Sequence, residues 1–382
     1  MYKRTLGQMP FTIQQGVQLD NNEPDNIYWN INVTNNSDQA QPMRTYLKMP
    51  DQVIGDGKMR YFSIMRLVID GTSIPKMLMD PGRFFVGIRI NPPLPDVPVL
   101  QMQEVIYDPA VVQGGGNYPD RHPIFNYQSF VDMWNVAYQL AWDSLPIVAA
   151  RALLASPPLY APKFLYDSAT GSIGFAVQQT YANPDLSQPA YAEVIMNNQV
   201  YNCVPSFHAN LKTERDLDYA SLIIRDYFLN REDVEVVGPP SEIFLKIKQE
   251  YSTLYNWFDI TNISLISGSL PITQELTPTI NLTDDNIVAS SAGSGSATQP
   301  IVTDFQPSFD FGDFAGVSGY LYYTPSVYRL IDVTNNSIDQ VDINIVLKDR
   351  QNREYTYFLP SRQTMYIKML LVKKSLYKSK NT

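Results

Sequence analysis

Alternation of apolar and polar residues at every second position is the feature that most constrains the fold of this chain. The alternation runs through residues 26–33, 61–69, 84–90, 341–348 and 365–371. Successive side chains of an extended strand point to opposite faces, so a period of two indicates strands with one apolar face. Strands of this kind are typical of antiparallel sheets that cover a core with one face and meet water or a partner with the other. We therefore predict a mainly β protein.

Turn residues support this prediction. Residues 167–171 separate two apolar runs and end in Gly171, which indicates a hairpin over residues 164–177. Residues 349–353 separate two further runs in the same way and predict a second hairpin, over residues 343–359.

A few helices are expected between the strands. Between Phe130 and Ala141 apolar residues recur at helical spacing, with Asn126 placed to cap the start and Pro146 to end the helix. Residues 146–155 could form a second short helix. Residues 214–229 fit a helix or an extended segment equally well.

Glycine, proline and serine mark two long loops and one domain boundary. Residues 94–120 and 284–300 are rich in turn-forming residues, so both are expected to be exposed loops. The composition changes at Gly238-Pro239-Pro240. We therefore predict one domain over residues 1–238, with inserted helices at about 127–155, and a second over residues 239–382.

Composition restricts the class of partner. Only 18% of the 382 residues are charged, whereas 12% are aromatic and 25 are tyrosine. A surface with so few charges indicates that neighbouring subunits cover part of it. The net charge of −9 argues against a general binder of polyanions.

Residues for soft-metal or thiol chemistry are scarce. Cys203 is the single cysteine, so the chain can form no internal disulfide. His122 and His208 are too few for a zinc site without carboxylates, and we interpret both as structural. No metal site and no cofactor are predicted.

Motifs of catalysis are present only as fragments. Asp310-Phe311-Gly312 matches a kinase tripeptide, and residues 114–116 are three glycines, but each lacks the rest of its motif. No Gly-x-Ser-x-Gly elbow occurs. We predict no catalytic residues and no enzyme activity.

Acidic loop residues leave two alternatives open. One set could hold calcium or, in a glycosidase, supply a carboxylate pair: Asp284, Asp285, Asp304, Asp310 and Asp313. Their spacing matches no EF-hand loop and singles out no pair, so we interpret them as solvated loop acids.

The C-terminus is basic. Its lysines could touch nucleic acid or form a solubilising tail: Lys373, Lys374, Lys378 and Lys380. The N-terminus lacks the apolar stretch of a signal peptide, and no apolar run is long enough for a transmembrane segment.

Residues 302–305, 322–332 and 343–350, followed by a Lys-rich strand, resemble the C-terminal roll of one group of viral proteins. These are the jelly-roll capsid proteins of the tectivirus–adenovirus lineage, including those of virophages and Polinton-like viruses. The resemblance covers residues 245–377. It implies an antiparallel jelly-roll sandwich in a shell subunit, either a homotrimeric double jelly roll or a homopentameric single roll at a vertex.

About seven or eight candidate strands on each side of residue 240 favour the double jelly roll, because one roll needs eight. A single roll with a large inserted domain stays open. The expected function is that of a structural capsid protein in the virion, which self-assembles and contacts other capsid proteins in an icosahedral shell. The alternatives are a vertex (penton) or minor capsid protein, and a carbohydrate- or receptor-binding β-sandwich.

Overall fold

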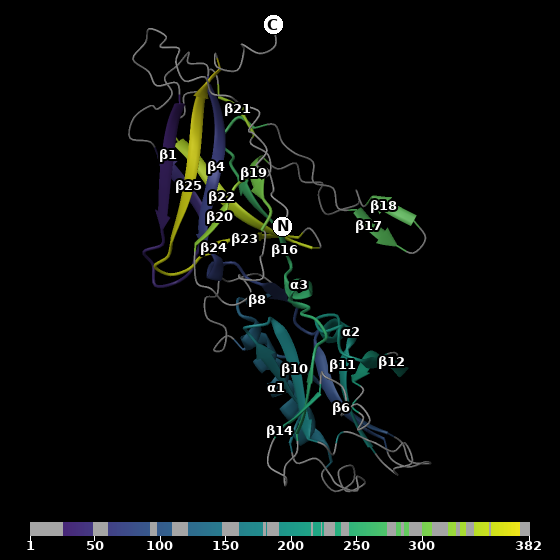
Figure 1. The fold of residues 1–382 in the computed structure, drawn as a ribbon. Coiled ribbons are helices and arrows are strands. Elements are labelled where there is room, and N and C mark those ends of the chain that lie inside the picture. Colours follow the sequence, from purple (N-terminus) through teal and green to yellow (C-terminus); the bar gives the residue numbers. More distant parts are fainter. Residues whose placement is uncertain are drawn as a thin grey trace, which may run out of the picture.

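The computed structural model shows a two-lobed, mainly β chain (Figure 1). It describes residues 26–48, 60–91, 98–108, 121–146, 160–178, 181, 191–214, 217–222, 224, 234–237, 244–272, 280–283, 286–289, 300–307, 320–325, 329–333, 340–350 and 353–374.

The first lobe is a sandwich of two antiparallel sheets, here called the terminal sandwich because both ends of the chain build it. One sheet has the order β1-β25-β4-β20, with β21 beside β4, and the other has the order β19-β16-β22-β23, with β3 beside β22. The strands are β1 (Asn26–Thr34), β3 (Arg44–Lys48), β4 (Arg60–Asp70), β16 (Ile260–Ile266), β19 (Ile301–Phe305), β20 (Tyr320–Tyr323), β21 (Ile331–Asp332), β22 (Gln340–Asp349), β23 (Glu354–Thr356) and β25 (Thr364–Lys373).

The period-two pattern explains the core of this sandwich. In β25, Met365, Ile367 and Met369 are buried, and they pack with buried residues of β4 and β22 such as Leu67 and Ile345. The half-buried strands predicted from the alternation are therefore confirmed, and the chain is mainly β and antiparallel.

The second lobe, here called the middle lobe, is built by the chain between Met77 and Trp257. Its larger sheet has the order β12-β13-β11-β6-β7 and its smaller sheet the order β14-β15-β10-β9. The elements are β6 (Phe85–Asn91), β7 (Val99–Glu104), α1 (Tyr127–Ser144), β9 (Lys163–Asp167), β10 (Ser172–Gln178), β11 (Tyr191–Asn197), α2 (Asn198–Tyr201), β12 (Ala209–Glu214), β13 (Leu217–Leu222), β14 (Val234–Val237) and β15 (Phe244–Lys248).

Short elements complete the described chain. Two-stranded pairs are formed by β2 (Gln41–Pro42) with β24 (Phe358–Leu359), β5 (Met77–Met79) with β8 (His122–Ile124), and β17 (Ile280–Thr283) with β18 (Asn286–Ala289). A 3-10 turn, η1, spans Gly71–Ser73, and α3 spans Leu254–Trp257.

Helix α1 confirms the predicted helix. The Asn126 side chain accepts a hydrogen bond from the Gln128 backbone N–H, and the helix ends at Ser144, just before Pro146. Its buried face carries Phe130 and Trp134, which meet Trp257 with ring centroids 5.4 and 5.1 Å apart. The helix thus fills the middle lobe with aromatic side chains.

Both predicted hairpins are also confirmed. Strands β9 and β10 pair antiparallel, and Gly171 closes their turn with a positive φ of 64°. Strands β22 and β23 pair antiparallel on either side of the second turn.

The strand pairing differs from the predicted domains at 1–238 and 239–382. Strands β14 and β15, which lie on either side of the predicted boundary at Gly238-Pro239-Pro240, pair with each other. Strand β1 pairs with β25 along its whole length, and β4 pairs with β25 on the other side. The two cores therefore follow a nested order, with the middle lobe inserted into the terminal sandwich. An alternating pattern states which face is buried but not which strand is the partner.

Two predicted loops contain strands. Within residues 94–120, β7 pairs with β6, and within residues 284–300, β18 pairs with β17.

Of residues 214–229, β13 is extended and pairs with β11, which decides against a helix there. The proposed helix at 146–155 lies outside the described residues, apart from Pro146. Among the helices of the described chain, none is long and apolar enough to cross a membrane.

Loss of the α1 cap gives a first prediction. Asn126→Ala leaves the Gln128 N–H without its side-chain acceptor and is expected to lower the free energy of unfolding by about 1 kcal/mol. Urea denaturation followed by tryptophan fluorescence measures the change. Asn126→Asp keeps an acceptor and serves as the control, and an equal loss in both variants would contradict the capping role.

Candidate functional site

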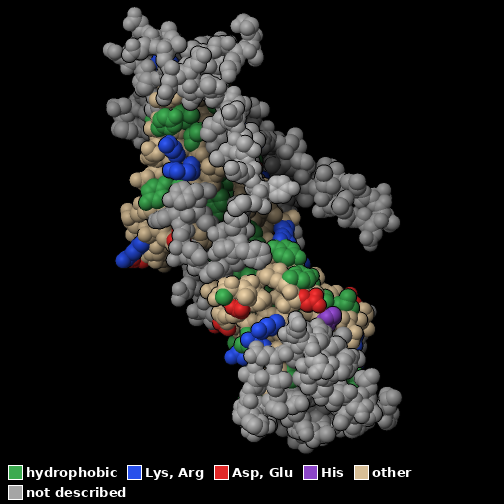
Figure 2. Space-filling view, in the orientation of Figure 1, with side chains coloured by type: hydrophobic (Ala, Val, Ile, Leu, Met, Phe, Trp, Pro, Cys, Tyr) green, Lys and Arg blue, Asp and Glu red, His purple; other side chains and the backbone are tan. Residues whose placement is uncertain are grey.

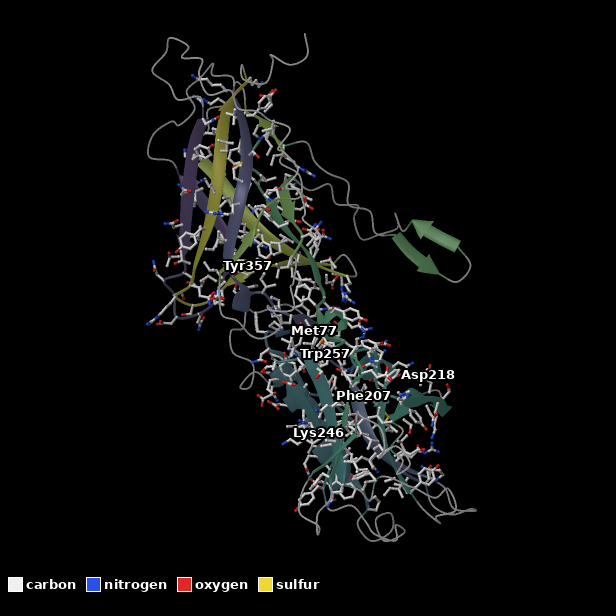
Figure 3. The ribbon with its side chains drawn as sticks, viewed as in Figure 1. Met77, Phe207, Asp218, Lys246, Trp257 and Tyr357 are labelled. Atoms are coloured by element: carbon white, nitrogen blue, oxygen red, sulfur yellow. The ribbon has the colours of Figure 1, made fainter. Side chains whose placement is uncertain are left out.

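The two cores meet where the chain passes from one lobe to the other. In β5, Met77 and Met79 belong to the core of the middle lobe, whereas Leu78 belongs to the core of the terminal sandwich. After α3 the same change occurs between Trp257 and Phe258. Figure 3 labels Met77 and Trp257 in the region between the lobes, and both belong to the core of the middle lobe. One strand with two buried faces therefore joins the cores without a flexible linker.

A buried ion cluster lies at this junction. The Arg121 side chain, 5% exposed, precedes β8, and its Nε lies 2.6 Å from Asp80 Oδ1. Its Nη1 lies 3.3 Å from Asp349 Oδ2 and donates to the Leu78 carbonyl oxygen at 3.3 Å. Arg121 and Asp80 come from the middle of the chain and Asp349 from the end of β22, so the cluster connects the two lobes.

Asp349 is saturated with donors. Its side chain is 1% exposed and accepts hydrogen bonds from the Arg353 N–H and Nε, both at 2.8 Å. The Tyr355 hydroxyl donates to Oδ2 at 3.1 Å. A carboxylate removed from water is tolerated only with such compensation, because the loss of hydration costs several kcal/mol.

Asp259 is the titratable group of the junction. Burial raises the pKa of its carboxyl from 3.8 to about 6, and the nearby Asp349 carboxylate adds to this shift. The guanidinium of Arg350 is the largest effect that opposes the shift. A backbone hydrogen bond from Leu78 and the charge of Arg121 oppose it further. The backbone N–H of Asp259 donates to the Lys76 carbonyl oxygen at 3.1 Å, and Arg350 donates to the Tyr255 carbonyl oxygen. The junction therefore holds one carboxyl that is protonated in mildly acidic solution.

A second buried carboxylate supports the terminal sandwich. Asp342 in β22 accepts hydrogen bonds from the Ser267 hydroxyl at 2.7 Å and from the backbone N–H groups of Gly268 and Ser269 at 2.9 and 2.8 Å. Burial alone would raise its pKa, but the hydrogen bonds from the Ser269 and Ser267 hydroxyls and from these two backbone N–H groups lower it to about 2. This carboxylate fixes the chain after β16 and stays ionised at neutral pH.

The histidines and the cysteine have structural surroundings. The His122 ring stacks on Tyr107 with centroids 4.3 Å apart, and His208 Nε2 lies 3.6 Å from Glu250 Oε1. Cys203 is buried, and burial raises the pKa of its thiol well above the ordinary value. Its carbonyl oxygen accepts hydrogen bonds from Thr253 Oγ1, at 2.7 Å, and from Trp257 Nε1.

The loop acids are not brought together in the described chain. Asp304 lies in β19, where its Oδ2 accepts a hydrogen bond from Asn262 at 3.1 Å. Asp284, Asp285, Asp310 and Asp313 lie outside the described residues, as do the tripeptide 310–312 and the glycines 114–116. The described residues contain no group of three or more His, Cys, Asp or Glu side chains placed to hold a metal.

Lys374 corrects one part of the predicted basic tail. It is buried at the end of β25, where its ammonium pairs with Asp332 and lies 5.2 Å from the Tyr61 ring centroid. It therefore belongs to the terminal sandwich and not to a solvated tail. Lys373 is half-buried in β25, and Lys378 and Lys380 lie outside the described residues, so a contact with nucleic acid stays a prediction.

Sequence reasoning missed the junction. Asp349 was interpreted as a hairpin residue, and Arg121 and Asp80 carried no motif. The available signal was weak: Asp349 and Arg353 flank one tight turn, but an arginine far away in sequence completes the cluster.

Removal of the central guanidinium gives a second prediction. Arg121→Met removes the buried guanidinium between Asp80 and Asp349 and leaves them the more exposed Arg353, so it is expected to cost about 3 kcal/mol of unfolding free energy. Thermal unfolding measures the loss. Arg362→Met, which removes a pair between side chains that are 79% and 84% exposed, is the matched control and should leave Tm unchanged. Equal effects of the two substitutions would contradict a clamp at the junction.

Titration of Asp259 gives a third prediction. Because folding raises its pKa from 3.8 to about 6, the folded state takes up a proton between these values. The stabilisation from this group is complete below pH 3.8 and is lost as pH rises through about 6.

Relative to Asp259→Asn, the wild-type chain should therefore gain about 1 kcal/mol between about pH 7.5 and about pH 5. Urea denaturation of both chains at both pH values measures this double difference. A difference of zero, or of the opposite sign, would show that Asp259 is not buried as described.

Comparison with known proteins places this architecture among virophage capsid proteins. The profile of the family described as Sputnik minor capsid protein V18/19 matches residues 101–373. Structural protein V19 of Sputnik virophage is 27% identical over 221 residues, which cover 56% of this chain and 95% of the relative.

Two solved structures share the fold. One is a chain in the cryo-EM structure of the Sputnik virophage, with a TM-score of 0.64 and 22% identity over 93% of this chain and 100% of the other. The other is the mavirus penton protein, with a TM-score of 0.59 and 14% identity over 92% of this chain and 100% of the other. The predicted resemblance to virophage capsid proteins is confirmed. The chain belongs to the Sputnik minor capsid protein V18/19 family and is a structural protein of the virion.

Proposed function

We propose that this chain is the vertex subunit of an icosahedral shell and that five copies associate into a homopentamer. The observation that carries the proposal is the nested architecture, one sandwich made from both chain ends with the middle lobe inserted. This arrangement extends over the part of the chain that shares its fold with the mavirus penton protein. It favours the alternative of a single roll plus an insertion over two consecutive rolls in a trimer.

The surface of the middle lobe offers an apolar contact for a neighbouring copy. Val136 and Leu140 lie four residues apart on α1 and are 61% and 45% exposed, so they share one face of the helix. Ile106, just after β7, is 67% exposed, and α1 packs against β7. Exposed aliphatic side chains on a helix that already buries its other face are suited to an interface between subunits.

The role proposed is structural and not enzymatic. The buried charges described above are compensated by partners within the chain, as Asp349 and Asp342 show. Such groups hold backbone segments in place, and their hydrogen bonds and ion pairs are made within the chain. Membership of a capsid protein family supports this role.

The mass of the purified full-length chain tests the pentamer. Light scattering coupled to size-exclusion chromatography is expected to give five times the mass of one 43.4 kDa chain, with fivefold rings in negative-stain images. Three times that mass would favour a trimeric shell subunit instead. A monomer at the highest attainable concentration would contradict self-association.

A paired substitution tests the apolar face in the same experiment. Val136→Lys combined with Leu140→Lys should shift the chain toward monomer, because it replaces apolar contacts by like charges. Gln139→Lys adds a charge to the exposed side of the same helix without removing apolar area and is the control. If both variants keep the same mass as the wild-type chain, α1 is not part of the interface.

A further inference from the structure

The outer face of the terminal sandwich carries an open pocket that the structural role does not explain. It lies on the sheet of β1, β25 and β4, on the side opposite the apolar core. Figure 2 shows Lys and Arg side chains beside hydrophobic ones over this lobe. The pocket has a volume of about 350 Å³, within the range of roughly 300–1,000 Å³ that is usual for small-molecule sites.

Strand register brings the lining residues into two rows. Lys368 in β25 lies opposite Asn30 in β1 and opposite Arg66 in β4, so an amide and two cations form one row. In the second row, Tyr366 lies between Asn32 and Val68. Both rows belong to the pocket lining, and in both the residues from β1 are exposed.

Two local features shape the pocket. The Lys368 ammonium lies 5.0 Å from the centroid of the Tyr28 ring, so a cation–π contact holds this side chain over the sheet. The register between β25 and β4 shifts between Lys368 and Met369, just before the apolar end of β25. Register shifts of this kind re-aim side chains and are frequent beside binding sites.

The chemistry of the lining selects the ligand. Lys368 and Arg66 lie directly opposite each other in the sheet, so an anionic group bound between them would interact with both cations. The described lining contains no carboxylate. Asn30 and Asn32 each provide a donor and an acceptor for hydroxyl groups, and the exposed Tyr366 ring provides an apolar surface for a sugar ring.

We propose that this pocket binds an acidic saccharide, with its carboxylate between Lys368 and Arg66 and its hydroxyl groups at Asn30 and Asn32. A single anionic group is favoured over a nucleic-acid strand for two reasons. The lining provides two cations and not a continuous basic track, and the whole chain has a net charge of −9. The inference does not depend on the number of copies in the assembly.

Titration of the full-length chain with four probes tests the proposal. Saturation-transfer NMR and calorimetry are applied with 3′-sialyllactose, a glucuronate-containing disaccharide, lactose and a short single-stranded DNA. One or both acidic sugars should bind about tenfold or more tightly than lactose. Comparison of the two acidic sugars identifies the source of the carboxylate. Lactose binding equal to that of the acidic sugars, no binding of either acidic sugar, or tighter binding of DNA would overturn the proposal.

Matched variants place the site. Lys368→Gln removes one cation, and Asn32→Asp adds a carboxylate to the exposed rim, so each should weaken binding about tenfold or more. Lys163→Gln removes an exposed cation from β9 in the middle lobe and should leave binding unchanged. Thermal unfolding and light scattering of every variant verify that the fold and the mass of the assembly are retained. If folded Lys368→Gln and Asn32→Asp chains bind like the wild-type chain, the pocket is not the site.

Discussion

The buried pair between Arg121 and Asp349 is the interaction on which the relation of the two lobes depends. The two charges come from different lobes, lie 3.3 Å apart and are almost completely removed from water. A buried pair of this kind adds little net stability compared with an apolar pair, but the loss of one partner is expensive. The pair therefore acts on specificity: an arrangement of the two cores that separates this carboxylate from this guanidinium takes one buried partner away from each charge.

The nested order of the chain increases the importance of that junction. The chain enters the middle lobe through β5 and leaves it after α3, so two covalent connections and the ion cluster lie within one short region. Trp257 anchors the exit by packing against Phe130 and Trp134 and donating to the Cys203 carbonyl. The two lobes are therefore joined by packed side chains as well as by the backbone.

Local patterns predicted local structure well. The apolar spacing around Phe130 predicted α1, Asn126 its cap, and Gly171 the turn between β9 and β10. Each of these features is decided by residues within a few positions of one another. The loops at 94–120 and 284–300 were predicted less well, because the strands β7 and β18 within them are short and depend on pairing with β6 and β17.

By itself the sequence determined the class of fold and the buried faces of the main strands. Its C-terminal strands also indicated the resemblance to virophage capsid proteins. Only the tertiary structure decided which strands are neighbours, and with them the domain order, the ion cluster and the pocket on the outer sheet. The physical reason is the same in each case. Alternation fixes which side of a strand is buried, but pairing between β1 and β25, or between Arg121 and Asp349, joins residues that are more than two hundred positions apart. No local pattern encodes such a contact, because many strands with the same alternation compete for each partner.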